Sequence, residues 1–119
     1  MSHDLRLVYP GTDDVVILDE PHQFRGGTYA MGGSPEAEFN ITYNYAKHLW
    51  RVLGDGGIKA IYGKTAAESI PILSEAAGKL GDDVDPDYWK PTEGNAKRAL
   101  QACLEIARRA PPDSVWTGD

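Results

Sequence analysis

The chain has 119 residues, of which 41% are hydrophobic and 25% are charged. This length and composition predict one globular domain, residues 1–119, with a single hydrophobic core. The formal net charge of −6 argues against direct binding of nucleic acid, because that affinity depends on Lys and Arg side chains that neutralise phosphates.

The first third of the chain shows β-strand patterns. Residues 5–9 alternate between apolar and polar side chains, and residues 15–18 form a short run rich in β-branched side chains. Turn-forming residues occupy positions 10–14, so we expect the two segments to form a β-hairpin. Residues 28–31, flanked by glycine pairs, and residues 37–41 are the candidates for a third and a fourth strand.

The first predicted helix follows the fourth strand directly. Apolar side chains recur at helical spacing from Tyr45 to Leu53, with Thr42 as the expected N-cap and Gly54 at the end. The side chain of Thr42 is expected to accept a hydrogen bond from the backbone of Asn44 or Tyr45. Residues 58–63 then form a short extended piece or turn.

Two further helices and a last strand are predicted in the second half. Thr65 and Glu68 match a capping box at the start of the second helix, and Pro71 is expected to kink or delay that helix because it removes a hydrogen bond. Residues 95–110 show the clearest helical pattern and are stopped by two prolines. Residues 114–117 are the candidate for a short edge strand.

These elements predict an α+β domain. We expect strands mainly within residues 1–41, helices mainly within residues 42–112, and an edge strand or tail at residues 113–119. The fold would be a small antiparallel sheet, built from N-terminal hairpins and the C-terminal edge strand and covered by about three α-helices.

Two segments concentrate aromatic and polar side chains. One is the strand-to-helix junction at residues 40–46, and the other is an acidic, proline-bounded loop at residues 82–91. Tyr and Trp are favoured anchors in protein interfaces, and acidic side chains suit a basic partner. The candidate partner contacts are Tyr43, Asn44, Tyr45, His48, Asp82, Asp83, Asp85, Asp87, Tyr88 and Trp89.

Structural interpretations of the same residues stay open. Short polar side chains at the junction, such as Asn40 and Asn44, can satisfy backbone groups that a strand-to-helix turn leaves without partners. Trp89 can equally fill a gap between the last two helices. The sequence does not decide between these interpretations and partner binding.

No metal site or cofactor is predicted. Asp83, Asp85 and Asp87 have the spacing of the first three ligands of a calcium loop, but Tyr88 and Gly94 stand where such a loop requires Gly and Glu. The remaining binding motif is a possible anion site formed by Lys64 and Thr65 at a helix N-terminus. It supports the alternative that the protein binds or sequesters a small molecule of nucleotide type.

Cys103 is the only cysteine, which excludes an internal disulfide and fits a reducing compartment. It falls on the apolar face of the third predicted helix, where a buried side chain is expected. The first residues are polar and lack the apolar run of a signal peptide, so we expect a cytoplasmic protein.

Three blocks of the sequence together resemble a family of small bacteriophage and prophage proteins. The blocks are the Asn-Ile-Thr-Tyr-Asn run at residues 40–44, residues 58–73, and the terminal helix closed by residues 110–113. The resemblance covers residues 39–116. It implies a site of action inside a bacterial host cell, but the family offers no catalytic residues to transfer.

Together, these observations favour a non-enzymatic binding protein of phage type that inhibits or modulates a host or defence-system protein. No nucleophile and base pair, metal-ligand set or cofactor loop can be assembled from the sequence. The nucleotide-type binder is the alternative, and the sequence leaves a homo-oligomer open.

Overall fold

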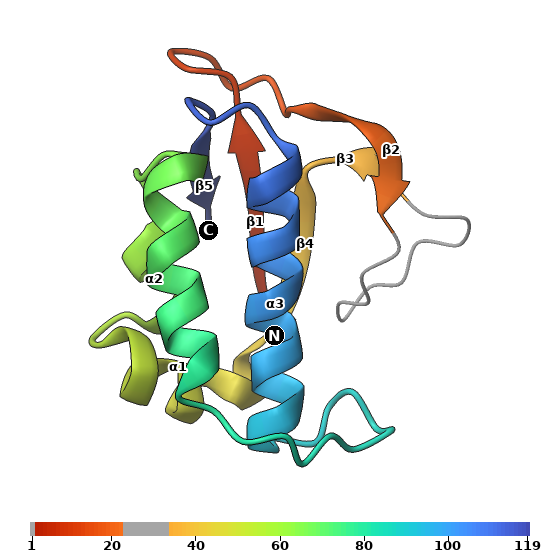
Figure 1. Cartoon of the computed structure of the whole chain (residues 1–119), viewed down its shortest axis with the longest axis vertical. Helices are drawn as coiled ribbons and strands as arrows, with labels where there is room; N and C mark the ends of the chain where they lie inside the picture. Colours follow the sequence, from red (N-terminus) through yellow and green to blue (C-terminus); the bar gives the residue numbers. More distant parts are fainter. Residues whose placement is uncertain (1, 23–33) are drawn as a thin grey trace.

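Figure 1 shows the computed structural model, which describes residues 2–22 and 34–119. The strands are β1 (Ser2–Val8), β2 (Ile17–His22), β3 (Ser34–Glu36), β4 (Glu38–Thr42) and β5 (Val115–Gly118). The α-helices are α1 (Ala46–Leu53), α2 (Ala66–Gly78) and α3 (Glu93–Arg109), and two 3-10 helices are η1 (Tyr43–Tyr45) and η2 (Gly57–Ile61).

The main sheet has three antiparallel strands in the order β4-β1-β5. Leu5 of β1 pairs with Phe39 of β4, and Leu7 pairs with Trp116 of β5. All four side chains are buried, so one face of the sheet is the apolar face. A second, two-stranded antiparallel sheet is formed by β2 and β3. The predicted α+β class is confirmed.

Helices α2 and α3 pack against each other in front of the main sheet, whereas α1 lies at one end of the molecule (Figure 1). The amphipathic helix α3 buries Leu100 and Ile106 completely, and α2 buries Leu73. At the centre of this layer, the indole N–H of Trp116 donates to the hydroxyl of Ser69 at 2.8 Å. The core therefore joins the two longest helices to the last strand.

The strand predictions were partly wrong about pairing. Residues 5–9 and 15–18 do approach each other, with an antiparallel bridge between Val8 and Val15, but β2 then leaves β1 and pairs with β3. The main partners of β1 are β4 and β5, because these strands complete the apolar face opposite the helices. The candidate strand at residues 28–31 lies outside the described residues.

The helix starts are set by threonine caps. The side chain of Thr42 accepts from the amide of Asn44 at 3.2 Å, as predicted, although the turn that it caps is η1 and not an α-helix. The capping box of Thr65 and Glu68 is confirmed. Thr92 caps α3, so this helix begins two residues earlier than expected.

The structure also bears on two other local expectations. Residues 58–63 were expected to be a short extended piece or a turn; most of this segment belongs to the 3-10 helix η2, which follows the left-handed Gly56, so the turn alternative is the correct one. Pro71 lies inside α2 without delaying its start or ending it, since the helix continues to Gly78. Residues 114–117 do form an edge strand, as β5.

Candidate partner-binding surface

The two segments singled out in the sequence meet in space. The hydroxyl of Tyr88 accepts from the amide of Thr42 at 3.0 Å and donates to the carbonyl of Asn40 at 3.3 Å. The hydroxyl of Tyr45 in turn donates to the carbonyl of Tyr88. The loop at residues 82–91 is therefore fastened to the strand-to-helix junction by two phenols.

A row of side chains from η1 and α1 holds the segment 89–93, and we call this arrangement the clasp. Its members are Asn44, His48 and Arg51. They donate to the carbonyls of Trp89 and Pro91 and to the carboxylate of Glu93, each at 2.8 Å. Spacings of four and three residues place side chains on one side of a helix, which is how one row reaches three points along the turn that leads into α3.

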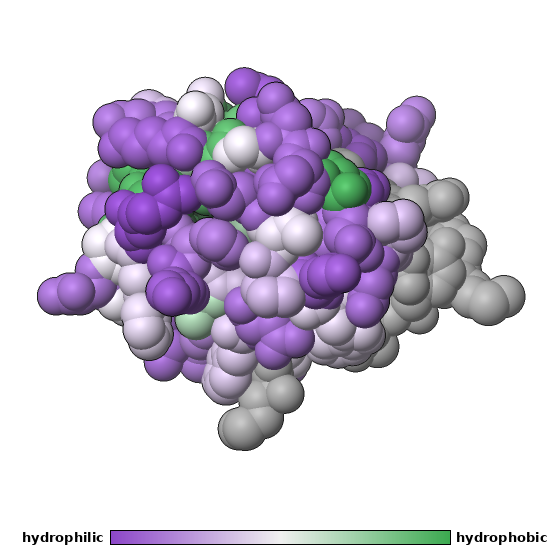
Figure 2. Space-filling model, turned by 90° about the horizontal axis from the view of Figure 1, so that it is seen from below, coloured by the Kyte–Doolittle hydropathy of each residue, from purple (hydrophilic) through white to green (hydrophobic). Residues whose placement is uncertain are grey.

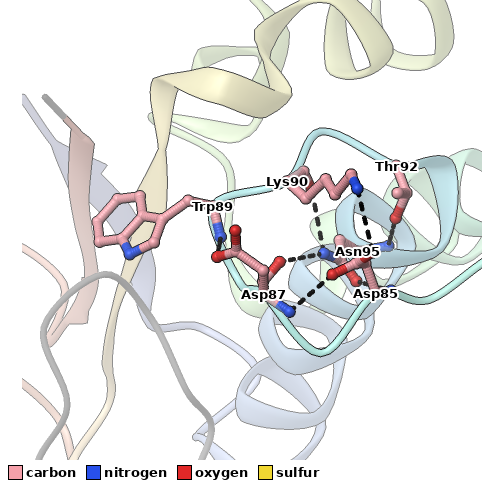
Figure 3. A network of polar contacts seen from close by, with 6 residues as sticks. All are labelled: Asp85, Asp87, Trp89, Lys90, Thr92 and Asn95. Carbon is pink, nitrogen blue, oxygen red and sulfur yellow. Dashed lines mark hydrogen bonds and ion pairs between the residues drawn. The ribbon is translucent and has the colours of Figure 1, made fainter.

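The loop is also held from within by Asn95, which is buried near the start of α3 (Figure 3). Its side-chain oxygen accepts from the amide of Asp85 at 3.0 Å, and its nitrogen donates to the carbonyls of Asp87 and Lys90 at 2.9 and 3.0 Å. Two carboxylates of the loop also accept from backbone amides two residues further along the chain. Asp85 accepts from the amide of Asp87, and Asp87 accepts from the amide of Trp89. Trp89 thus follows a turn whose backbone is hydrogen-bonded by the side chains of Asn95, Asp85 and Asp87.

The four loop carboxylates differ in what neutralises them. Asp82 pairs with Lys97 at 2.7 Å, and Asp85 lies 3.6 Å from Lys90. Asp83 accepts from the amide of Gly94 at 3.0 Å. Within residues 2–22 and 34–119, neither Asp83 nor Asp87 forms an ion pair.

Exposure separates the predicted contacts into two groups. Tyr45 is only 1% exposed and Tyr88 is half-buried against the core, so both serve the junction. Tyr43 is 40% exposed and Trp89 is 48% exposed. Their segments are joined by the bond from Asn44 to Trp89. We define the aromatic–acidic surface as the exposed residues Tyr43, Asp87 and Trp89.

The described residues form no broad apolar face at this end of the molecule. Figure 2 looks at it from below and shows mainly hydrophilic residues, with hydrophobic residues in small separate areas. Large obligate interfaces are more apolar than this. Any partner contact here would depend on a few anchoring side chains.

The sequence did not identify Trp50 as a surface residue. We expected it at an apolar helix position, but Trp50 is 58% exposed on α1. It lies against η2, where a Cβ atom on Gly57 would come within 2.9 Å of the indole. Helical spacing alone did not reveal the exposure of Trp50, because Trp50 follows directly after Leu49, which is the residue of α1 that is buried.

The possible anion site at the start of α2 has its amides occupied. The amides of Ala66 and Ala67 donate to the carbonyls of Ser114 and Pro112 at 2.8 and 3.1 Å. The amide of Glu68 donates to Thr65, whose own amide donates to the Glu68 carboxylate. A phosphate next to Lys64 would have to displace these bonds and approach a carboxylate, which counts against binding there.

Among the described residues, no group of three or more His, Cys, Asp or Glu side chains is placed to hold a metal ion. Cys103 is buried, and burial raises the pKa of its thiol to about 12, so it is not available as a nucleophile. In the ranges that the structure covers, no helix is long and apolar enough to cross a membrane.

Comparison with known proteins gave no match: no family model, curated protein or solved structure is similar to the chain.

Proposed function

We propose that this is a non-enzymatic binding protein of phage type, which inhibits or modulates a host or defence-system protein in the cytoplasm of a bacterial cell. The aromatic–acidic surface would contact that partner. The exposure of Trp89 on a turn that is hydrogen-bonded on both sides is the observation that carries the proposal. The phage and host context comes from the resemblance of residues 39–116.

Trp89 has the properties of an interface anchor. Trp and Tyr are enriched among the residues that contribute most to binding. Binding costs less entropy when a side chain is already held in place. The backbone of Trp89 is fixed by Asp87 and Asn44, and its ring stacks edge-on against Tyr88 with centroids 5.0 Å apart. An exposed indole on a hydrogen-bonded backbone, with one ring contact to Tyr88, suits recognition of another molecule.

Tyr43 extends the same surface. Its ring lies 4.5 Å from the ring of His3, measured between centroids, so it is also supported on one side while 40% of the residue stays exposed. Two supported, exposed rings on joined segments provide two anchors for a partner.

The test is affinity capture from bacterial lysate with matched variants. A Tyr43→Ala/Trp89→Ala double variant should lose a protein that the wild type retains, with its affinity lowered by about 30-fold or more, as expected for anchor residues. The captured protein should change its activity when the wild-type chain is added, and keep it when the double variant is added.

A control variant removes exposed apolar side chains elsewhere. Tyr9 and Ile17 are also exposed, and their segments lie at the opposite end of the molecule from the 82–91 loop (Figure 1). Tyr9→Ala/Ile17→Ala should retain the partner. If the two double variants behave alike, or if the wild type alters no captured protein's activity, the proposal is wrong.

A further inference from the structure

We infer that the partner presents a cationic segment to the aromatic–acidic surface, with an arginine guanidinium over Trp89 and against Asp87. This inference rests on the proposed function and specifies the chemistry of the partner. The exposed indole of Trp89 lies beside the carboxylate of Asp87, which has no cationic partner among the described residues.

Asp87 and Trp89 project from the same turn. One carboxylate oxygen of Asp87 accepts from the amide of Trp89 at 3.1 Å, so the negative charge is fixed next to the residue that carries the indole (Figure 3). Tyr88 contacts the indole edge-on, yet 48% of Trp89 stays exposed. A guanidinium can stack on an aromatic ring and pair with a carboxylate at the same time.

Three cationic side chains in and around the loop form ion pairs with carboxylates other than Asp87. Lys97 pairs with Asp82, Lys90 with Asp85, and Arg51 with Glu93. Asp87 is thus the carboxylate beside the exposed ring that these three cations do not neutralise. The formal net charge of −6 for the whole chain adds a long-range attraction for a cationic partner.

A carbonyl or an apolar side chain could also contact Trp89, but neither would use the charge of Asp87. A segment with Arg next to small residues would use both groups. Arginine is preferred over lysine here because its planar, weakly hydrated head stacks on indole and still donates to a carboxylate.

The experiment uses capped Arg-Gly repeat peptides as probes, with the same peptide carrying citrulline as the uncharged control. Binding is followed by the indole N–H signal of Trp89, assigned with Trp89→Phe. The arginine peptide should shift this signal saturably and the citrulline peptide should not. Raising ionic strength from about 0.1 M to about 1 M, which shortens the Debye length from about 10 Å to about 3 Å, should weaken the shift.

Matched charge variants isolate Asp87. Asp87→Asn keeps an oxygen that can accept from the amide of Trp89 and should weaken the arginine peptide by about three- to fivefold, the size expected of an exposed ion pair. Asp13→Asn changes net charge equally in the exposed turn between β1 and β2 and should have no effect. If Asp87→Asn and Asp13→Asn change the affinity for the arginine peptide equally, the inference is overturned. It is also overturned if the arginine and citrulline peptides shift the Trp89 signal equally.

The outcome for the captured partner separates this inference from the proposed function. If loss of Trp89 and Tyr43 abolishes capture while Asp87→Asn and salt leave it unchanged, the binding function stands and the cationic partner is wrong. If capture survives loss of both rings, the proposed function at this surface fails, whatever the peptides do.

Discussion

Removing the Tyr88 hydroxyl tests whether the loop is fastened to the junction. Tyr88→Phe deletes the acceptor of the Thr42 amide and the donor to the Asn40 carbonyl. Thr42 is only 1% exposed, so water does not easily replace the lost acceptor. A buried donor left without a partner costs about 1–3 kcal/mol. With an unfolding entropy of about 0.25 kcal/mol/K for a chain of this length, the melting temperature should fall by about 4–12 °C.

The matched control is Tyr9→Phe. The Tyr9 hydroxyl also accepts a backbone amide, from Ile17 at 3.4 Å, but both residues are exposed and water can take its place. Its loss should change stability by no more than about 0.5 kcal/mol. Thermal unfolding followed by circular dichroism, with hydrogen exchange at the Thr42 amide, measures both variants. If Tyr88→Phe melts like Tyr9→Phe and the Thr42 amide stays protected, the hydroxyl does not bridge the two segments.

Three further predictions concern the scaffold. Hydrogen bonds from the backbone amide and side chain of Thr65 lower the pKa of Glu68 from its ordinary value of 4.5. The stability that this lowered pKa contributes is present above pH 4.5 and is lost as pH falls through the lowered value. The melting temperatures of the wild type and of Glu68→Gln should therefore converge in acid. Gly94→Ala would place Cβ 2.5 Å from the Val84 amide nitrogen and should cost about 1–3 kcal/mol in urea unfolding, whereas Gly78→Ala meets nothing within 4 Å and should be neutral or stabilising by up to about 1 kcal/mol. Because burial raises the pKa of Cys103 to about 12, the native thiol should not react with a disulfide reagent at neutral pH, and reaction before unfolding would contradict the packing of α3.

Local signals were the ones that the sequence revealed reliably. The capping box at Thr65 and Glu68 and the cap at Thr42 involve residues two or three apart, so a short stretch of sequence is enough to predict them. The start of α3 was placed too late because Gly94 weakens a helical pattern. In the structure this glycine is required, since the backbone of residues 83 and 84 packs against it.

Long-range pairing could not be predicted in the same way. Residues 5–9 and 15–18 carried a good hairpin pattern, and nothing in it showed that β1 would pair with β4 and β5 instead. The candidate site had the same limit. The sequence identified both segments, at residues 40–46 and 82–91. It did not show that Tyr88 and Tyr45 would hydrogen-bond the two segments to each other and so be unavailable as partner contacts.

The position of β1 between β4 and β5 also has a kinetic consequence. Asp4 and Asp119, which bond where β1 meets the residue after β5, are 115 residues apart in the sequence, and β5 supplies Trp116 to the core between α2 and α3. Closing so long a loop is entropically unfavourable, and contacts between distant residues slow folding. We expect α2 and α3, which are close in sequence and joined by residues 79–92, to pack together first, and β1 to dock only after β5 is in place. Until then the edges of β1 are unpaired, and unpaired strand edges in a partly folded chain favour aggregation.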